Sequence, residues 1–236
     1  MESMFTIKDL ISDAKTALEA GSYFSALSLT FAIIAECANI AYPDEWFDKN
    51  ADTDEYLQKK FASHYNKNGK YNCQNHDRER FQMWVDDWEN DHNCDESLKS
   101  QMKEYTERIN EERKTENGSL PITDGELLYQ LRCSLFHNAS SDIEFSNSNK
   151  ISDECNSKIL QENFALILDD CNLSNGVYSV DSSGEMSMRP SVNYIISHYL
   201  NLVELFVENN RDKSFPTIKV NDNRKLNPER NLCHNG

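Results

Sequence analysis

The sequence predicts a mainly α-helical protein, built as an antiparallel helical bundle with a helical insertion and a small antiparallel β-hairpin or meander. Apolar residues recur at helical spacing near both ends of the chain and in its middle. Strand-like runs separated by Asn-Gly and Ser-Ser-Gly are confined to one stretch. We therefore expect one domain with these boundaries: helical domain 1–210, acidic helical insertion 44–120, small β element 163–189 and locally basic C-terminal tail 211–236.

Two helices open the predicted bundle. Thr6 is suited to cap the first helix, because Asp9 stands three residues later and completes a capping box, and Gly21 ends this helix. The second helix, 23–41, is apolar nearly all round and stops before Pro43. A helix of this composition belongs at the centre of a bundle.

Glu36 is the one acidic residue of the second helix. Burying a lone carboxylate costs free energy unless it has a partner. Two interpretations stay open: Glu36 reaches water at the helix edge, or it pairs with Arg132.

The segment 44–120 differs in character, with short helical patches between polar connections. The patches at 56–65 and 79–89 are weakly amphipathic, and 97–116 has the pattern of a charged helix. Because 79–89 carries apolar residues on one face, it needs a partner. We expect the insertion to pack against the bundle.

The stretch 126–138 carries the most informative pattern. Its leucines recur at helical spacing, and Thr123-x-x-Glu126 supplies a capping box at its start. Arg132 and His137 then interrupt the apolar pattern. Beyond it we expect, in order, a polar loop to 149, a short helix at 153–161, strands at 164–168, 177–180 and 185–188, and a long final helix after Pro190.

The spacing Arg132-x4-His137, preceded by Leu-Tyr-x-Leu and followed by Asn138, resembles the signature of the HEPN superfamily. The flanking apolar helices extend this resemblance over 7–41, 126–138 and 190–210. The resemblance implies an antiparallel HEPN-like bundle with the pair near the end of a helix. It also implies a metal-independent endoribonuclease in which two protomers build one site, with RNA as substrate. One departure is Cys133, where HEPN nucleases usually carry a polar residue such as Asn or Asp.

Arg132 and His137 suit RNA cleavage chemically. An Arg binds a phosphate bidentately and stabilises its developing charge, while a His moves protons at neutral pH. On a regular helix five residues turn through about 140°, so a second protomer is needed to complete the site. Ser134, Asn138 and Glu36 are auxiliary candidates. The resemblance further implies a defence or toxin-like role, with an antitoxin or regulatory protein as partner.

Two other interpretations remain open. In one, the chain is a catalytically inactive HEPN-like module that binds a nucleotide, an RNA or a protein partner. In the other, Arg132 pairs with a surface carboxylate and His137 interacts favourably with the helix dipole. Cys133 and the net charge of −16 favour inactivity, since such a charge repels polyanions.

Composition and cysteine usage indicate a cytoplasmic protein. No run approaches the roughly 20 apolar residues of a membrane span, and the amino end lacks the pattern of a signal peptide. Seven cysteines without a Cys-x-x-Cys pair indicate reduced thiols.

A metal site has one weak candidate in the sequence. Cys73, His76, His92 and Cys94 supply the donor types that zinc prefers. However, a single residue separates His92 from Cys94, which strains simultaneous chelation. His64 has no companion in the sequence that suggests a site. We expect no metal and no other cofactor.

Overall fold

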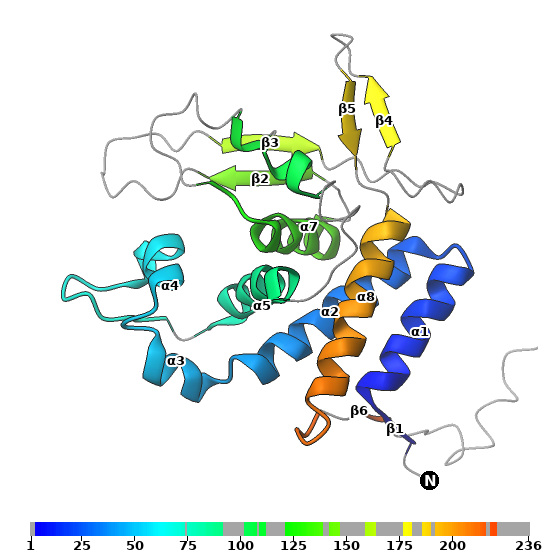
Figure 1. The fold of residues 1–236 in the computed structure, drawn as a ribbon, viewed down its shortest axis with the longest axis horizontal. Coiled ribbons are helices and arrows are strands. Elements are labelled where there is room, and N and C mark those ends of the chain that lie inside the picture. The colour runs from blue at the N-terminus through cyan, green and yellow to red at the C-terminus, as the bar shows by residue number, and fades with distance from the viewer. Residues whose placement is uncertain are drawn as a thin grey trace, which may run out of the picture.

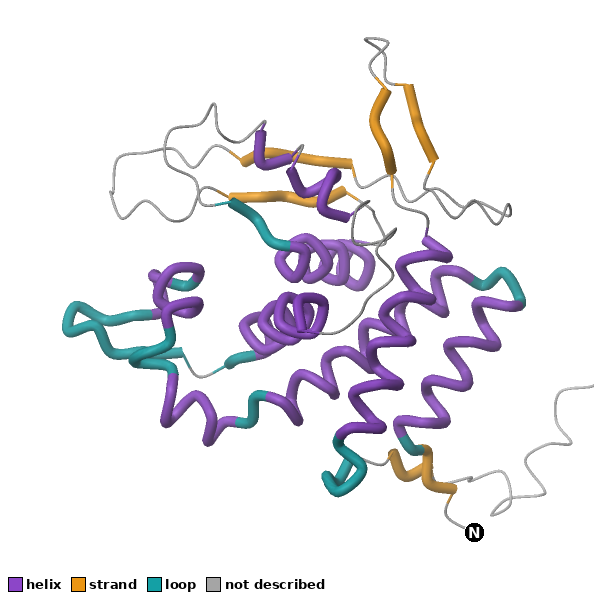
Figure 2. Tube along the Cα trace, viewed as in Figure 1, coloured by secondary structure: helices purple, strands orange, loops and turns teal. Residues whose placement is uncertain are grey.

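A computed structural model describes residues 3–73, 75–91, 102–107, 109–111, 121–138, 142–146, 159–163, 177–180, 186–189, 192–215 and 218–220. At 89–91, at 137–138 and in the strands the description is of the backbone alone. The prediction of a mainly helical protein is confirmed (Figures 1 and 2).

Helices α1 (Ile7–Glu19), α2 (Tyr23–Ala41) and α8 (Val192–Asn209) lie side by side, as Figure 1 shows. The predicted capping box at the start of α1 is present. The Thr6 amide donates to the Asp9 carboxylate at 2.7 Å, and the Asp9 amide donates to Thr6 Oγ1 at 3.4 Å. These hydrogen bonds lower the pKa of Asp9.

The middle helix α2 is the centre of the main core. It packs against α1, α5 (Asp77–Asp91) and α8. Within the described part of the chain it is also the one helix long and apolar enough to cross a membrane. Because its Phe31, Ile33 and Ile34 are fully buried among neighbouring helices, it behaves as a core helix.

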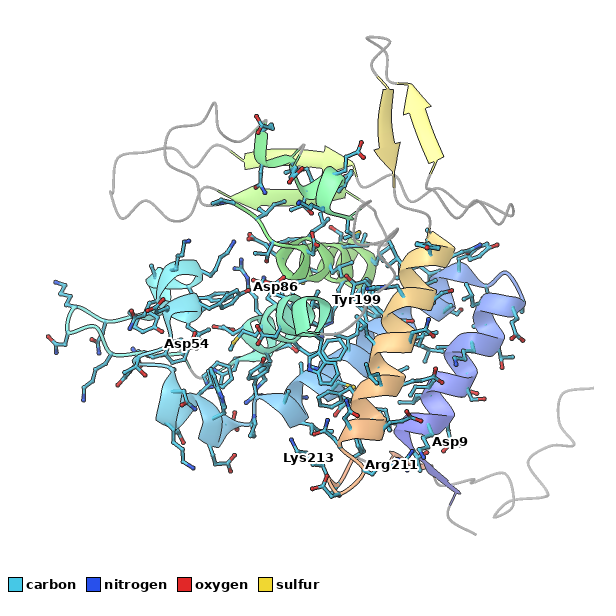
Figure 3. All side chains as sticks on the ribbon, viewed as in Figure 1. Asp9, Asp54, Asp86, Tyr199, Arg211 and Lys213 are labelled. Carbon is cyan, nitrogen blue, oxygen red and sulfur yellow. The ribbon has the colours of Figure 1, made fainter. Side chains whose placement is uncertain are left out.

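Helices α5 and α7 (Asp124–Asn138) also belong to the bundle. The helical residues 102–107 and 109–111 add Met102, Tyr105 and Ile109 to the same core. Helices α5 and α7 approach each other closely at Gly125, because a Cβ there would be 2.5 Å from the Gln82 carbonyl oxygen. Asp86, labelled in Figure 3, accepts the Gly125 amide at 2.8 Å and the Tyr56 hydroxyl at 2.8 Å. This one carboxylate therefore joins three elements.

The expected insertion 44–120 is divided between two cores. Phe81, Trp84 and Val85 of α5 lie in the main core, so α5 belongs to the bundle itself. Before it, α3 (Asp44–Asn50), α4 (Glu55–Lys60) and the short 3-10 helix η1 (Ala62–His64) form a side lobe. That lobe has its own small buried cluster: Phe47, Ala51, Leu57, Phe61 and Met83.

Three antiparallel strand pairs surround the helices. They are β1 (Ser3–Phe5) with β6 (Ile218–Val220), β2 (Asp142–Ser146) with β3 (Ile159–Asn163), and β4 (Val177–Val180) with β5 (Met186–Arg189). The third pair lies within the expected β element 163–189, and 164–168 lies outside the described residues. The first pair links the start of the chain to its expected tail 211–236.

Two expectations after α7 were wrong. The expected polar loop contains β2, and the last residues of the expected helix 153–161 lie in β3. Ile143 and Phe145 alternate with polar residues, which is strand periodicity, and the local polarity masked it. Pairing with β3 satisfies the backbone groups on the edge of β2 that faces β3.

Candidate functional site

Arg132 is held at the surface between α5 and α7 by one carboxylate and two aromatic rings. Its Nη1 donates to Asp77 Oδ2 at 2.8 Å. The guanidinium carbon lies 5.5 Å from the Phe81 ring centroid and 5.4 Å from that of Tyr129. Because the side chain keeps 21% exposure, the guanidinium is oriented but still reaches solvent.

The open question of the Arg132 partner is thereby answered. Arg132 pairs with Asp77 and not with Glu36, which lies half-buried on α2. Asp77 stands 55 residues before Arg132 in the chain, so sequence periodicity could not identify it. Its position in the first turn of α5, where a carboxylate is favoured by the helix dipole, was the available signal.

Two further cations, one on α5 and one on α4, pair with a carboxylate of α7. Arg78 Nη2 is 3.8 Å and Lys60 Nζ is 3.9 Å from the carboxylate of Glu126. With Arg132 they form what we call the basic cluster: Lys60, Arg78 and Arg132. The carboxylates of Asp77 and Glu126 offset two of these three positive charges.

Cys133 follows Arg132 and is half-buried. Burial raises the pKa of its thiol, although the Tyr129 hydroxyl and the Arg132 charge act in the opposite direction. Burial also raises the pKa of Tyr129. Burial therefore favours the neutral form of both groups.

Helix α7 continues without a break through position 138. Positions 132 and 137 are therefore about 140° apart around its axis, and the helix end does not unwind to bring them together. Within one protomer the backbone separates the predicted Arg132 and His137 pair. The side chains of His137 and Asn138 lie outside the described residues.

Ser134 is separated from Arg132 as well. It is 8% exposed and faces the interior, about 200° around the helix from Arg132. The structure thus does not bring this expected auxiliary donor to the guanidinium.

A second group of chemically capable side chains lies in the side lobe. His64, Cys73 and Glu79 place their ligand atoms within 4.8 Å of one another. The sequence candidate paired Cys73 and His76 with His92 and Cys94, and these last two residues lie outside the described part. The expectation that no other residue forms a site with His64 was wrong, since the His64 Nδ1 atom is 2.6 Å from Glu79 Oε1.

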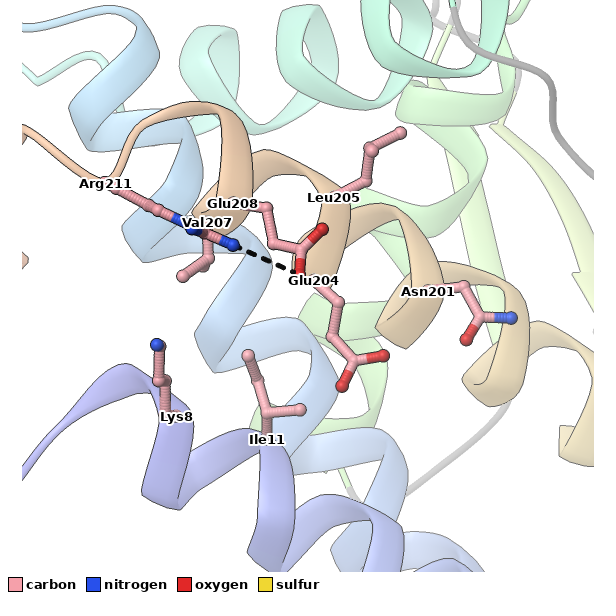
Figure 4. Close-up of a pocket in the computed structure, with 8 residues that line it drawn as sticks. All are labelled: Lys8, Ile11, Asn201, Glu204, Leu205, Val207, Glu208 and Arg211. Atoms are coloured by element: carbon pink, nitrogen blue, oxygen red, sulfur yellow. Dashed lines mark ion pairs between the residues drawn. The ribbon is translucent and has the colours of Figure 1, made fainter.

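A groove of about 510 Å³ runs between α1 and α8 (Figure 4). Three of its charged side chains form ion pairs: Glu204 with Lys15 at its edge, at 2.6 Å, and Arg211 with Glu208 at 3.7 Å. The opposite charges cancel within each ion pair. Among the described residues that line the groove, no acid and base are arranged in a way that suggests catalysis.

Comparisons with models of protein families, with curated proteins and with solved structures find no match to this chain.

Proposed function

We propose that this chain is a HEPN-like, metal-independent endoribonuclease that acts as a cytoplasmic homodimer. Its catalytic residues are Arg132, which binds the scissile phosphate, and His137, which transfers protons. The observation that carries the proposal is the oriented, partly exposed Arg132 guanidinium five residues before a histidine on one continuous helix. A defence or toxin-like role follows from the resemblance to HEPN proteins.

The setting of Arg132 supports phosphate binding. One of its N–H groups is used by Asp77, and the planar fork keeps further donors for a phosphate. Contacts with two aromatic rings restrict the side chain, which reduces the entropy lost when an anion binds. Arg78, whose side chain is 39% exposed, offers a second cation for an RNA phosphate.

The geometry of α7 supports a composite site. Since one helix separates positions 132 and 137 by about 140°, a phosphate bound to Arg132 cannot reach His137 of the same protomer directly. A two-fold dimer through the ends of two α7 helices solves this, because each Arg132 then faces the partner's His137.

The second candidate is an inactive HEPN-like module that binds a nucleotide, an RNA or a protein partner such as an antitoxin. The Asp77 ion pair favours it, because Asp77 competes with phosphate for Arg132. Cys133 favours it too, since its neutral thiol lacks the hydrogen-bonding capacity of the usual polar residue.

Cleavage assays with single substitutions separate the two candidates. His137→Ala removes proton transfer and slows cleavage by roughly 10² to 10⁴-fold, while RNA affinity stays nearly unchanged. Arg132→Ala weakens both binding and cleavage. A substrate with a 2′-deoxy sugar at the cut position resists the wild type.

An inactive module gives a different pattern in the same assay. Wild type then cleaves no more than the Arg132→Ala/His137→Ala double variant on any RNA tested. That result, or cleavage that His137→Ala leaves intact, would remove the ribonuclease proposal and leave the binding module.

A further inference from the structure

The loop between α4 and α5 is folded so that distant residues meet (Figures 1 and 2). Tyr65 and Tyr71 form an isolated antiparallel bridge, and the Asn72 amide donates to the His64 carbonyl at 2.7 Å. Gly69 takes the left-handed backbone at φ 72° that closes the turn. The cysteine that follows Asn72 is thereby set beside His64.

Glu79, in the first turn of α5, supplies a buried carboxylate to the same place. It is 1% exposed. Its Oε1 is 2.6 Å from His64 Nδ1 and accepts the Tyr71 hydroxyl at 2.9 Å. Its Oε2 is buried and has no hydrogen-bond partner among the described residues. An unsatisfied buried carboxylate oxygen is costly, and a cation would satisfy it.

We propose that His64, Cys73 and Glu79 bind one Zn²⁺ ion. Their ligand atoms lie within 4.8 Å of one another. Tetrahedral zinc with bonds of about 2.0 to 2.3 Å needs ligand atoms about 3.5 Å apart, so small side-chain shifts complete the geometry. The thiolate selects zinc over magnesium and calcium, which prefer oxygen ligands only.

Zinc displaces the thiol proton when it binds. The Cys73 thiol releases its proton on forming the sulfur–zinc bond. His64 binds as the neutral imidazole, through one ring nitrogen while the other keeps its hydrogen, and Glu79 binds as the carboxylate. Three protein ligands leave a fourth position for water. His76 stands next to this group, because its Nδ1 is 3.2 Å from the Tyr71 hydroxyl.

The ion has a structural role in the side lobe. Among the described residues the buried cluster there has five apolar side chains, which is a small core for several short elements. Five partly buried aromatic residues pack around it: Tyr42, Trp46, Tyr56, Tyr65 and Tyr71. Zinc would tie the loop that carries His64 and Cys73 to α5, and binding energy available only to the folded lobe stabilises it. This site is independent of the proposed ribonuclease, since Arg132 takes no part in it.

The test uses the full chain, purified without added metal, then stripped with a chelator and titrated with Zn²⁺ or Co²⁺. We expect one zinc per chain, a rise in melting temperature on rebinding, and a cobalt–thiolate charge-transfer band with Co²⁺. Cys73→Ser and Glu79→Gln each lower zinc affinity by about 100-fold or more, beyond the usual loss for a supporting residue. Cys133→Ser, a half-buried cysteine on α7, is the matched control and keeps zinc.

Alkylation of the wild type gives a second readout that needs no variant. Bound zinc should protect Cys73 from iodoacetamide, as identified by peptide mass spectrometry, and stripping should expose it. Zinc that binds without protecting Cys73, zinc retained by Cys73→Ser, or failure of the stripped protein to bind Zn²⁺ would each overturn the proposal. Loss of RNA cleavage with zinc binding intact would affect only the proposed function.

Discussion

At the scale of single residues, the Asp77 carboxylate and the phosphate of the proposed RNA substrate compete for the Arg132 guanidinium. The Arg132 side chain is 21% exposed and that of Asp77 42%. An ion pair this accessible is worth at most about 1 kcal/mol. A phosphate that forms two charge-assisted hydrogen bonds is therefore able to displace it.

Asp77→Asn should strengthen RNA binding, because it removes the competing charge while keeping a side chain of the same shape. The expected gain in affinity is about two- to fivefold, corresponding to the small worth of the pair. Binding to a short labelled RNA at fixed salt measures it. Glu55→Gln, which removes one exposed negative charge on α4, is the control. Equal gains in the two variants would mean that only net charge matters.

Several tyrosines should make the protein sensitive to alkali. Burial raises the pKa of Tyr65 to about 12 and raises those of Tyr56, Tyr71 and Tyr129 as well. In the unfolded chain tyrosine ionises near pH 10. Above about pH 10 the unfolded state therefore binds fewer protons than the folded state, and stability falls as pH rises.

Melting temperatures between pH 8 and pH 11 measure this effect. Tyr56→Phe removes one contributing group, and also its hydrogen bond to Asp86. The variant should melt lower at pH 8 but lose less stability on going to pH 11. A slope unchanged by this substitution would show that Tyr56 does not contribute to the alkaline loss.

At the scale of elements, the contact of α5 with α7 controls where Arg132 lies. Gly125→Ala should push the helices apart, because its Cβ would be 2.5 Å from the Gln82 carbonyl oxygen and 2.9 Å from Asp86 Oδ1. Overpacking of this kind costs about 1 to 3 kcal/mol. Denaturant unfolding measures it, with Ser12→Ala on exposed α1 surface as a control within about 0.5 kcal/mol. Equal stability of the two variants would contradict the close approach.

Local signals predicted the helices well. The capping pair Thr6 and Asp9 and the apolar length of 23–41 are properties of adjacent residues, so α1 and α2 could be predicted from sequence. The strand β2 could not, because its partner lies more than a dozen residues further along and its two apolar residues sit in a polar stretch.

The candidate sites depended on distant contacts. Asp77 meets Arg132 across 55 residues, and Glu79 meets His64 across 15. These pairs form because of the way α5 packs against other parts of the chain. The residue pattern of a short stretch of sequence does not predict this packing. The sequence indicates Cys73 as a metal-ligand type, but only the fold shows that His64 and Glu79 lie beside it.

At the scale of the whole molecule, a net charge of −16 confines RNA to a local basic surface. The basic cluster has three cations against the carboxylates of Asp77 and Glu126, so its net positive charge is small in one protomer. Doubling it across a two-fold axis would concentrate positive charge in one place, which is a further reason to expect activity from a dimer.

Phe136 offers a direct test of that dimer. It is 50% exposed and precedes His137 at the end of α7. Phe136→Glu should shift the protein towards monomer in sedimentation experiments at micromolar concentration, because two charges would meet at the axis. Phe24→Glu, at the other large exposed apolar residue among those described, is the matched control at 56% exposure. A wild type that sediments as a monomer would contradict the composite site.

The most direct test of the account is complementation between two inactive variants. Arg132→Ala and His137→Ala proteins are mixed in equal amounts, allowed to exchange subunits, and assayed for RNA cleavage. A mixed dimer has one site with the Arg132 of one chain and the His137 of the other, so random exchange predicts about a quarter of wild-type activity. Cleavage by the mixture that stays at the level of the separate variants, while wild type cleaves, would contradict a site shared between protomers.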